Sequence, residues 1–200
     1  ALPILGVNAF KVGSAYLAQL SLERAARPFM EALVERLNLS ANLGILAQHE
    51  VLYMAIVEAS SVLRYASAVG QRQDIHCSAL GKVLAAELPL TRVRAILAQT
   101  GMPRKTDKTI TDPDTFLAQL ETVRAQGYAV DEEESGIGVK CLAAPVRDHH
   151  GEVVCALSVS GPSTFYQPEQ VAGIIEAVQQ TAQAISERLG HMPEIGSWKQ

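Results

Sequence analysis

Hydrophobic residues recur at steps of three and four between Leu22 and Leu37, which places them on one side of an amphipathic helix. A shorter helix over about 12–20 is predicted to precede it. Pro28 is expected to kink or split the longer helix, because proline lacks the amide hydrogen and crowds the preceding turn. The stretch 42–69 is equally apolar but lacks helical spacing, so it predicts two or three strands.

In the rest of the chain, several residues predict where helices begin and end. Ser78 and Asp112 are predicted N-caps, because their side chains can accept hydrogen bonds from first-turn amides, and Pro113 suits the first helical position. Gly127 is expected to end the second of these helices in the left-handed conformation. The predicted helices cover about 79–86, 91–99, 113–125 and 169–190.

Three further segments are predicted to be strands, over about 128–130, 139–146 and 153–160. The run 148–151 is expected to form the turn between the last two. Helices therefore surround strands that are joined partly by hairpins, and the alternating strand and helix rhythm of a doubly wound sheet is missing. This pattern predicts an α+β fold with a mostly antiparallel sheet flanked by helices.

Composition narrows the class of protein. The chain has 200 residues, 48% of them hydrophobic and 19% charged, which is enough to bury one domain core. Its 17 basic and 21 acidic residues give a net charge of −4 without a basic stripe, so this segment is not expected to bind nucleic acid by itself. No apolar run approaches the ~20 residues that span a membrane. Three widely spaced cysteines without a CxxC pair favour a reducing, cytoplasmic setting.

Two serines stand out in the last predicted strand. Side chains alternate between the faces of a strand, so Ser158 and Ser160 point the same way. In the preceding strand, alternation groups Val139, Cys141 and Ala143 on one face, which could be the face of the serines. The plainer alternative is that each hydroxyl makes a local hydrogen bond near a strand end.

The helix that begins after Ser78 offers a second feature. The N–H groups of Ala79 and Leu80 lack intrahelical acceptors and lie at the positive end of the helix dipole, which suits an anion. An ordinary capped helix is the alternative. Among the four consecutive carboxylates 131–134, Asp131 lies nearest a strand and is the one expected to face inward, where it would need donors from a ligand or an arginine.

Several kinds of chemistry have little support. His76, Cys77, Cys141 and the pair His149 and His150 lack the spacing of structural zinc sites, so no metal is expected. Neither a nucleophile elbow nor a nucleotide-binding loop is present, and no cofactor is expected. Two alternatives remain open: a hydrolase that uses Cys141 with a histidine, and an oligomerisation module whose core is filled.

The order of several short motifs resembles the C-terminal effector-binding domain of the IclR family of bacterial transcription regulators, and the likeness covers nearly the whole chain. These motifs are Leu63-Arg64-Tyr65, the segment His76 to Lys82, Thr109-Ile110-Thr111-Asp112, Gln126 to Glu133, Gly138 to Val146, and Leu157 to Pro162.

The resemblance implies a GAF-like α+β domain that binds a small organic acid and forms a homodimer or homotetramer. It also implies a winged helix-turn-helix that binds operator DNA and is not in this chain, which is then expected to be a truncated or proteolysed regulator. Residues 1–20 look like the linker helix of the family, 21–190 like the effector-binding domain and 191–200 like a tail.

The resemblance also implies a ligand-binding set. Carried over position by position, it consists of Val62, Tyr65, Ala79, Leu80, Asp131, Val139, Cys141, Ser158 and Ser160. The helix amides and the serine hydroxyls would bind a carboxylate, Asp131 would accept from a ligand hydroxyl, and the apolar members would form a wall. Small residues are usual in the family at the helix entry, so the bulkier Leu80 bears on the volume of the pocket.

Overall fold

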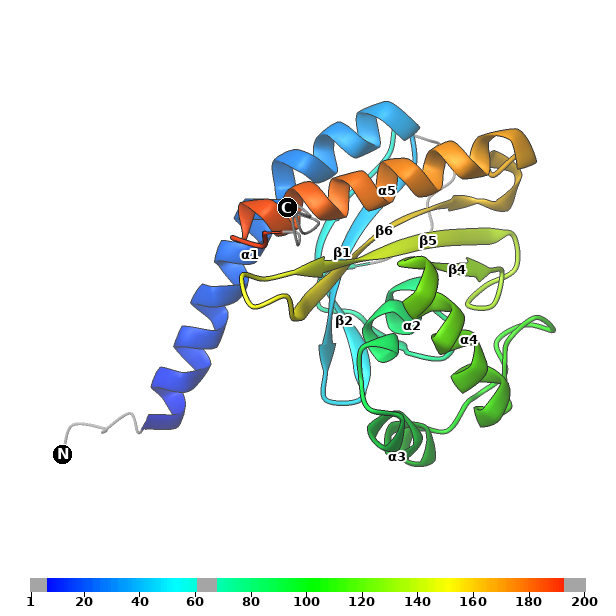
Figure 1. Ribbon diagram of the computed structural model, residues 1–200, viewed down its shortest axis with the longest axis horizontal. Coiled ribbons are helices and arrows are strands. Elements are labelled where there is room, and N and C mark those ends of the chain that lie inside the picture. Colours follow the sequence, from blue (N-terminus) through cyan, green and yellow to red (C-terminus); the bar gives the residue numbers. More distant parts are fainter. Residues whose placement is uncertain (1–6, 61–67, 193–200) are drawn as a thin grey trace, which may run out of the picture.

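The computed structural model describes residues 7–60 and 68–192, with side chains from residue 22 onward. In this part of the chain, six strands form one sheet in the order β3-β2-β1-β6-β5-β4, and every neighbouring pair is antiparallel. Helices α1 and α5 cover one face of the sheet, and α2, α3 and α4 lie on the other (Figure 1). The predicted α+β class with an antiparallel sheet is confirmed.

The elements have the following bounds. The helices are α1 (Val7–Leu37), α2 (Ala79–Ala86), α3 (Leu90–Thr100), α4 (Pro113–Gln126), a short 3-10 turn η1 (Ser163–Phe165) and α5 (Pro168–Arg188). The strands are β1 (Ser40–Ala47), β2 (Glu50–Val57), β3 (Arg72–Asp74), β4 (Ala129–Glu132), β5 (Val139–Arg147) and β6 (Val153–Pro162).

The N-terminal helix differs from the prediction, because the two expected helices form the single helix α1. Pro28 lies inside α1 without ending it. Its missing amide frees the carbonyl of Arg24, and both residues lie on the exposed side of the helix, where water can bond that oxygen. The predicted domain boundary near residue 20 falls within α1, and the domain limits stay a prediction.

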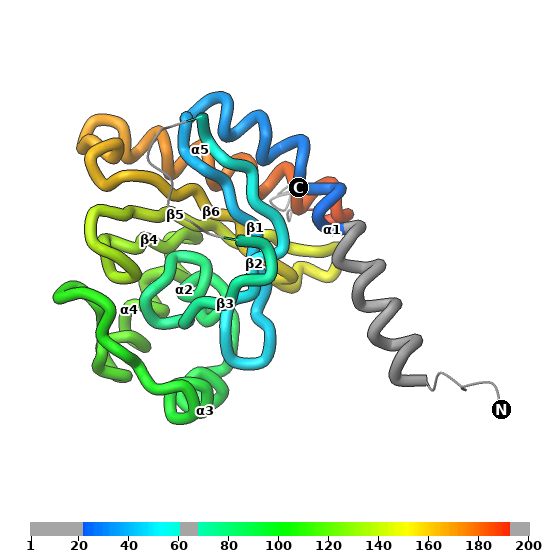
Figure 2. Tube along the Cα trace, turned by 180° about the vertical axis from the view of Figure 1, so that it is seen from behind, coloured from blue at the N-terminus to red at the C-terminus, as the bar shows by residue number. Residues whose placement is uncertain are grey.

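The strands after α1 are partly as predicted. β1 and β2 fall in the stretch where two or three strands were expected, and they pair as an antiparallel hairpin. The expected strand at Leu63-Arg64-Tyr65 lies outside the described residues. The short edge strand β3 was not predicted, because its sequence Arg72-Gln73-Asp74 has no apolar alternation to mark a strand. Figure 2 shows β3 at the rim of the sheet beside β2.

The predicted caps are confirmed. The Ser78 hydroxyl accepts a hydrogen bond from the Gly81 amide at 3.1 Å, and the Asp112 carboxylate accepts one from the Thr115 amide at 2.8 Å. Gly127 ends α4 in the left-handed region at φ 74°. Local side-chain chemistry therefore sets where α2 begins and where α4 begins and ends.

Alternation along each strand divides the sheet between two apolar cores. On β6, Leu157 and Val159 face the core that α1 and α5 close, while Ala156 faces the core of α2, α3 and α4. Leu142 on β5 belongs to the first core, and Ala143 to the second. The face toward α2 is the one that carries the polar residues described next.

Candidate functional site

Five polar side chains on four adjacent strands lie on the sheet face toward α2 and form what we call the polar row: Asn42, Ser158, Ser160, Cys141 and Asp131. The strand register brings them together. Asn42 is paired with Ser158, Ser160 with Cys141, and Cys141 with Asp131. The structure thus confirms that the two serines share a face, and that Cys141 lies on it as well.

The first turn of α2 faces the polar row. Ser78 occupies the N-cap and satisfies the Gly81 amide, so the N–H groups of Ala79 and Leu80 remain the first-turn donors without an intrahelical acceptor. Gly81 permits the segment before α2 to pack against the first turn of the helix, because a Cβ there would lie 2.4 Å from the Cα of Ile75. The helix therefore presents two amides and the positive end of its dipole to the polar row.

Between helix and sheet is a small hollow that we call the α2 cavity. Its lining consists of Asn42, Tyr53, Gln73, Ser78, Ala79, Leu80, Asp131, Cys141, Ser158 and Ser160. Its volume is about 10 Å³, which is the space of one water molecule. An organic acid is larger, so it can enter only if α2 or the side chains around the cavity shift.

Leu80 lines the α2 cavity, and the end of its side chain lies against β1 at Gly44. A Cβ on Gly44 would lie only 3.0 Å from Leu80 Cδ1 and 2.9 Å from Val51 Cγ1. The missing side chain of Gly44 therefore accommodates the bulk of Leu80 against the sheet.

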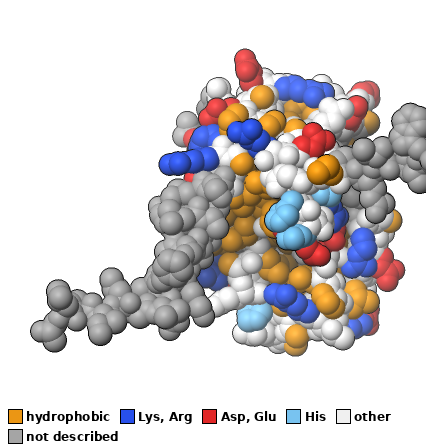
Figure 3. Space-filling view, turned by 60° about the vertical axis from the view of Figure 1, so that its left-hand side comes forward, with side chains coloured by type: hydrophobic (Ala, Val, Ile, Leu, Met, Phe, Trp, Pro, Cys, Tyr) orange, Lys and Arg blue, Asp and Glu red, His pale blue; other side chains and the backbone are white. Residues whose placement is uncertain are grey.

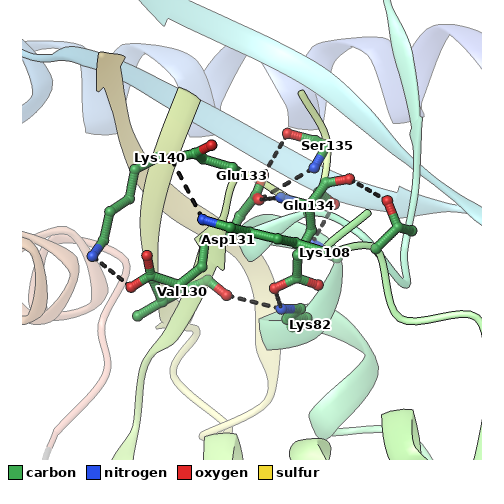
Figure 4. A network of polar contacts seen from close by, with 12 residues as sticks. Lys82, Lys108, Val130, Asp131, Glu133, Glu134, Ser135 and Lys140 are labelled. Carbon is green, nitrogen blue, oxygen red and sulfur yellow. Dashed lines mark hydrogen bonds and ion pairs between the residues drawn. The ribbon is translucent and has the colours of Figure 1, made fainter. Parts of the chain in front are cut away.

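Asp131 is fully buried at the end of the polar row. One carboxylate oxygen accepts hydrogen bonds from the amides of Glu134 (2.6 Å) and Ser135 (3.2 Å), and the other accepts from the Ser135 hydroxyl (Figure 4). Burial raises its pKa to about 6, and the bonds from Ser135 and Glu134 oppose this rise. Asp131 thus obtains its donors from its own loop and not, as expected, from a ligand or an arginine, and its pKa of about 6 lies well above that of an ordinary aspartate.

The same loop is tied to α2 by a buried ion pair. Lys82 has no exposed surface, and its ammonium group contacts Glu134 Oε1 and donates to the Val130 carbonyl at 2.9 Å (Figure 4). Glu134 Oε2 is buried without a hydrogen-bond partner. The position of α2 over the polar row thus depends on the segment that follows β4.

The thiol of Cys141 is poorly suited to nucleophilic attack. Burial raises its pKa well above the ordinary value, and the neighbouring Asp131 charge raises it further. A cysteine nucleophile needs the opposite shift, because the thiolate is the reactive form. The buried ring of His76 forms a hydrogen bond with the Pro103 carbonyl (Nε2 to O, 3.2 Å).

A group of potential metal ligands lies beside the start of α2. One ligand atom from each of Asp74, His76 and Cys77 lies within 4.8 Å of the others. The sequence reasoning had considered His76 and Cys77 but not Asp74. The Asp74 carboxylate already forms an ion pair with Lys105 at 2.9 Å, and burial raises the pKa of Cys77 to about 12. A cation here would compete with the lysine and would have to displace the thiol proton.

The predicted site residues divide into three groups. Six of them line the α2 cavity: Ala79, Leu80, Asp131, Cys141, Ser158 and Ser160. Val139 begins β5, pairs with Pro162 and is not among the lining residues. Val62 and Tyr65 lie outside the described residues.

The sequence did not predict four of the residues that line the α2 cavity: Asn42, Tyr53, Gln73 and Ser78. Ser78 was predicted only as a helix cap. A signal existed for Asn42, which is the one polar side chain in the otherwise apolar run from Ala41 to Ala47. Its place beside Ser158 depends on strand register, which sequence alone does not supply.

A larger hollow opens elsewhere, with a volume of about 740 Å³. Its lining is mostly apolar and includes Leu22, Leu46, Leu84 and Leu88, with His149 at its edge, and Figure 3 shows hydrophobic side chains exposed beside the histidines. Its other lining residues include Glu87, Arg92, Asp148 and Glu152, and none of its lining residues carries a hydroxyl group. The α2 cavity instead combines two strand serines, Asn42 and the first turn of α2, which suit a carboxylate, so it is the better candidate site despite its small volume.

A family model described as bacterial transcriptional regulator IclR C-terminal matches residues 14–187. The chain belongs to the IclR family. The motifs that carried the resemblance thus identified the correct family, and the described fold is that of its C-terminal, effector-binding domain.

Proteins of similar sequence and structure support the same family assignment. The HTH-type transcriptional regulator BhcR of Paracoccus denitrificans is 35% identical over 182 residues, which are 91% of this chain and 65% of BhcR. The chain thus spans about two thirds of that relative. The crystal structure of the C-terminal domain of the Escherichia coli regulator KdgR has 30% identity and a TM-score of 0.77, and the match covers 85% of this chain and 99% of that domain.

A third relative was crystallised with a ligand. The inducer-binding domain of the PobR transcription factor from Acinetobacter, a double mutant in complex with 3-hydroxybenzoic acid, has 27% identity and a TM-score of 0.75. The match covers 82% of this chain and 96% of that domain.

Among the described helices, none combines the length and apolar character that a membrane crossing requires.

Proposed function

We propose that this chain senses a small organic acid in the α2 cavity, and that binding changes the affinity of a winged helix-turn-helix, elsewhere in the regulator, for operator DNA. The observation that carries the proposal is that Ala79 and Leu80, in the first turn of α2, line one small cavity together with Ser158 and Ser160. Amides and hydroxyls that converge at a helix N-terminus suit a carboxylate. The acid bound by the PobR domain supports the same ligand class.

Each predicted residue has a role in this proposal. The Ala79 and Leu80 amides and the two serine hydroxyls bind the carboxylate, while Asp131 and Cys141 border the rest of the ligand. Val139 stays a proposed wall residue at the mouth of the site, and Val62 and Tyr65 stay proposed members of the same wall. The proposal involves reversible binding of the acid only, and it includes neither a metal nor a cofactor.

The small volume of the α2 cavity suggests how binding is coupled to the rest of the protein. An acid is larger than this space, so its entry moves α2 or the side chains that surround the cavity. The ligand therefore favours a conformation that differs from the described one, and such unequal affinity for two states is what allosteric control requires. We propose that this shift is transmitted through a homodimer or homotetramer to a pair of DNA-binding domains.

The first test removes both hydroxyls. In Ser158→Ala/Ser160→Ala, calorimetric titration with a panel of small carboxylates should show at least about ten-fold weaker binding, because an anion loses two charge-assisted hydrogen bonds. Ser186→Ala is the matched control: Ser186 is also buried, but its hydroxyl donates to Ala182 on α5, behind the other face of the sheet. Equal affinity in the double variant and the wild type would contradict the site.

The regulatory part needs the full-length regulator. Operator affinity measured with and without a bound acid should differ by about 5- to 150-fold, the usual range for allosteric coupling. Unchanged operator affinity at saturating acid would rule out the proposed control while leaving acid binding itself intact.

A further inference from the structure

Within the polar row, Asn42 carries the one buried side-chain nitrogen or oxygen atom that has no hydrogen-bond partner. Its side chain is 2% exposed, and its Nδ2 donates to Ser160 Oγ at 3.0 Å and to Ser158 Oγ at 3.4 Å. Its Oδ1 is buried and has no hydrogen-bond partner. Asn42 lines the α2 cavity. A buried acceptor left unpaired is costly, so this oxygen needs a donor that the described residues do not supply.

The two hydrogen bonds from Asn42 Nδ2 also affect whether the serine hydroxyls can donate hydrogen bonds. A hydroxyl that accepts a hydrogen bond from Asn42 directs its own hydrogen elsewhere, because the lone pair toward the amide is occupied. Asn42 therefore leaves the hydroxyl hydrogens of Ser158 and Ser160 available to another acceptor, and both serines line the α2 cavity. An anion between these hydroxyls and the α2 amides would receive hydrogen bonds from both sides.

The α2 cavity thus has two chemically different ends. The end at Ala79 and Leu80 offers amide donors and suits a carboxylate, whereas the end at Asn42 offers an acceptor and suits a hydroxyl or N–H group. Both ends border the same small cavity. One short molecule that carries both groups on neighbouring atoms would satisfy both ends.

We propose that Asn42 is a specificity-determining residue that selects short hydroxy acids over acids of the same size without a hydroxyl. This inference rests on the proposed function, since it assumes that an acid binds in the α2 cavity. It adds the chemistry of the second group on the ligand, and it assigns a role to a residue that the family resemblance did not supply.

Two pairs of acids test the proposal by calorimetry on this chain: glycolate against acetate, and lactate against propionate. The wild type should bind each hydroxy acid at least about ten-fold more tightly, because acetate and propionate leave Asn42 Oδ1 unpaired. In Asn42→Leu, which has no acceptor, the preference should fall below about two-fold. Asn38→Gly is the control: it removes an exposed carboxamide at a backbone φ of 51°, which glycine adopts easily.

The outcomes are distinguishable. If the wild type binds none of the four acids, the proposed function fails for short acids and this inference fails with it. If the acids bind without a hydroxyl preference, or if the preference survives in Asn42→Leu, the inference alone is overturned. Circular dichroism checks that the variant folds, and if it does not, the wild-type preference decides the question.

Discussion

At the scale of single residues, Asp131 combines burial with a pKa near the neutral range. Its pKa rises from 3.8 to about 6, chiefly because burial penalises the charged form. Between these two values the folded protein holds a proton that the unfolded chain releases. Protonated Asp131 therefore stabilises the fold at low pH, and this contribution is lost as the pH rises through about 6.

Replacing Asp131 by Asn should remove this pH dependence, because the amide stays neutral. The unfolding free energy of Asp131→Asn relative to wild type is expected to increase by about 2 kcal/mol between pH 4 and pH 7, measured by urea denaturation. Asp112→Asn is the control, and its stability relative to wild type should change little between pH 4 and pH 7: hydrogen bonds from Thr115 lower the pKa of Asp112, so its linkage to stability lies mainly below pH 4. A difference that is the same at both pH values would contradict the assignment for Asp131.

At the scale of elements, α2 is held over the polar row by a contact that hydrophobic packing does not provide. Lys82 lies in the middle of α2 with no exposed surface, and its partner Glu134 lies in the segment after β4. Desolvating two charges offsets much of their attraction, so the pair adds little net stability. Removing one partner should nevertheless lower the stability strongly, because the remaining charge is then buried without a counter-charge.

Lys82→Met should therefore lower the unfolding free energy by about 3–5 kcal/mol at pH 7. Lys82→Met/Glu134→Gln should lose clearly less, because no charge then remains buried. Urea denaturation of the three proteins checks this prediction. A double variant that is less stable than the single one would show that the ion pair itself, rather than the isolated carboxylate, carries the effect.

How much the sequence predicts depends on whether a feature is local. The caps Ser78 and Asp112 and the shared face of Ser158 and Ser160 follow from neighbouring residues, and they were predicted correctly. Asn42 was missed because it meets Ser158 only through the pairing of β1 with β6, which are distant in sequence. The role of Gly44 in accommodating Leu80 likewise depends on how α2 packs on β1.

At the scale of the whole molecule, one sheet serves two cores. Successive residues of β6 alternate between them: Ser158 borders the α2 cavity, while Leu157 and Val159 pack under α1 and α5. We propose that a displacement at the cavity reaches the opposite helices through the backbone of the same strands. This shared sheet is the physical basis on which a ligand under α2 can affect the far side of the domain.

The shared sheet also predicts that the two cores unfold together. Leu157→Ala removes a fully buried side chain from the core of α1 and α5, which should cost about 2–5 kcal/mol. If the sheet joins both cores into one cooperative unit, the slowest-exchanging amides of α2 and α4 should lose the same protection as those of α5 in hydrogen exchange. Loss of protection confined to α5 and the N-terminal helix would show that the cores open separately, and the coupling proposed through the strands would then lack its mechanical link.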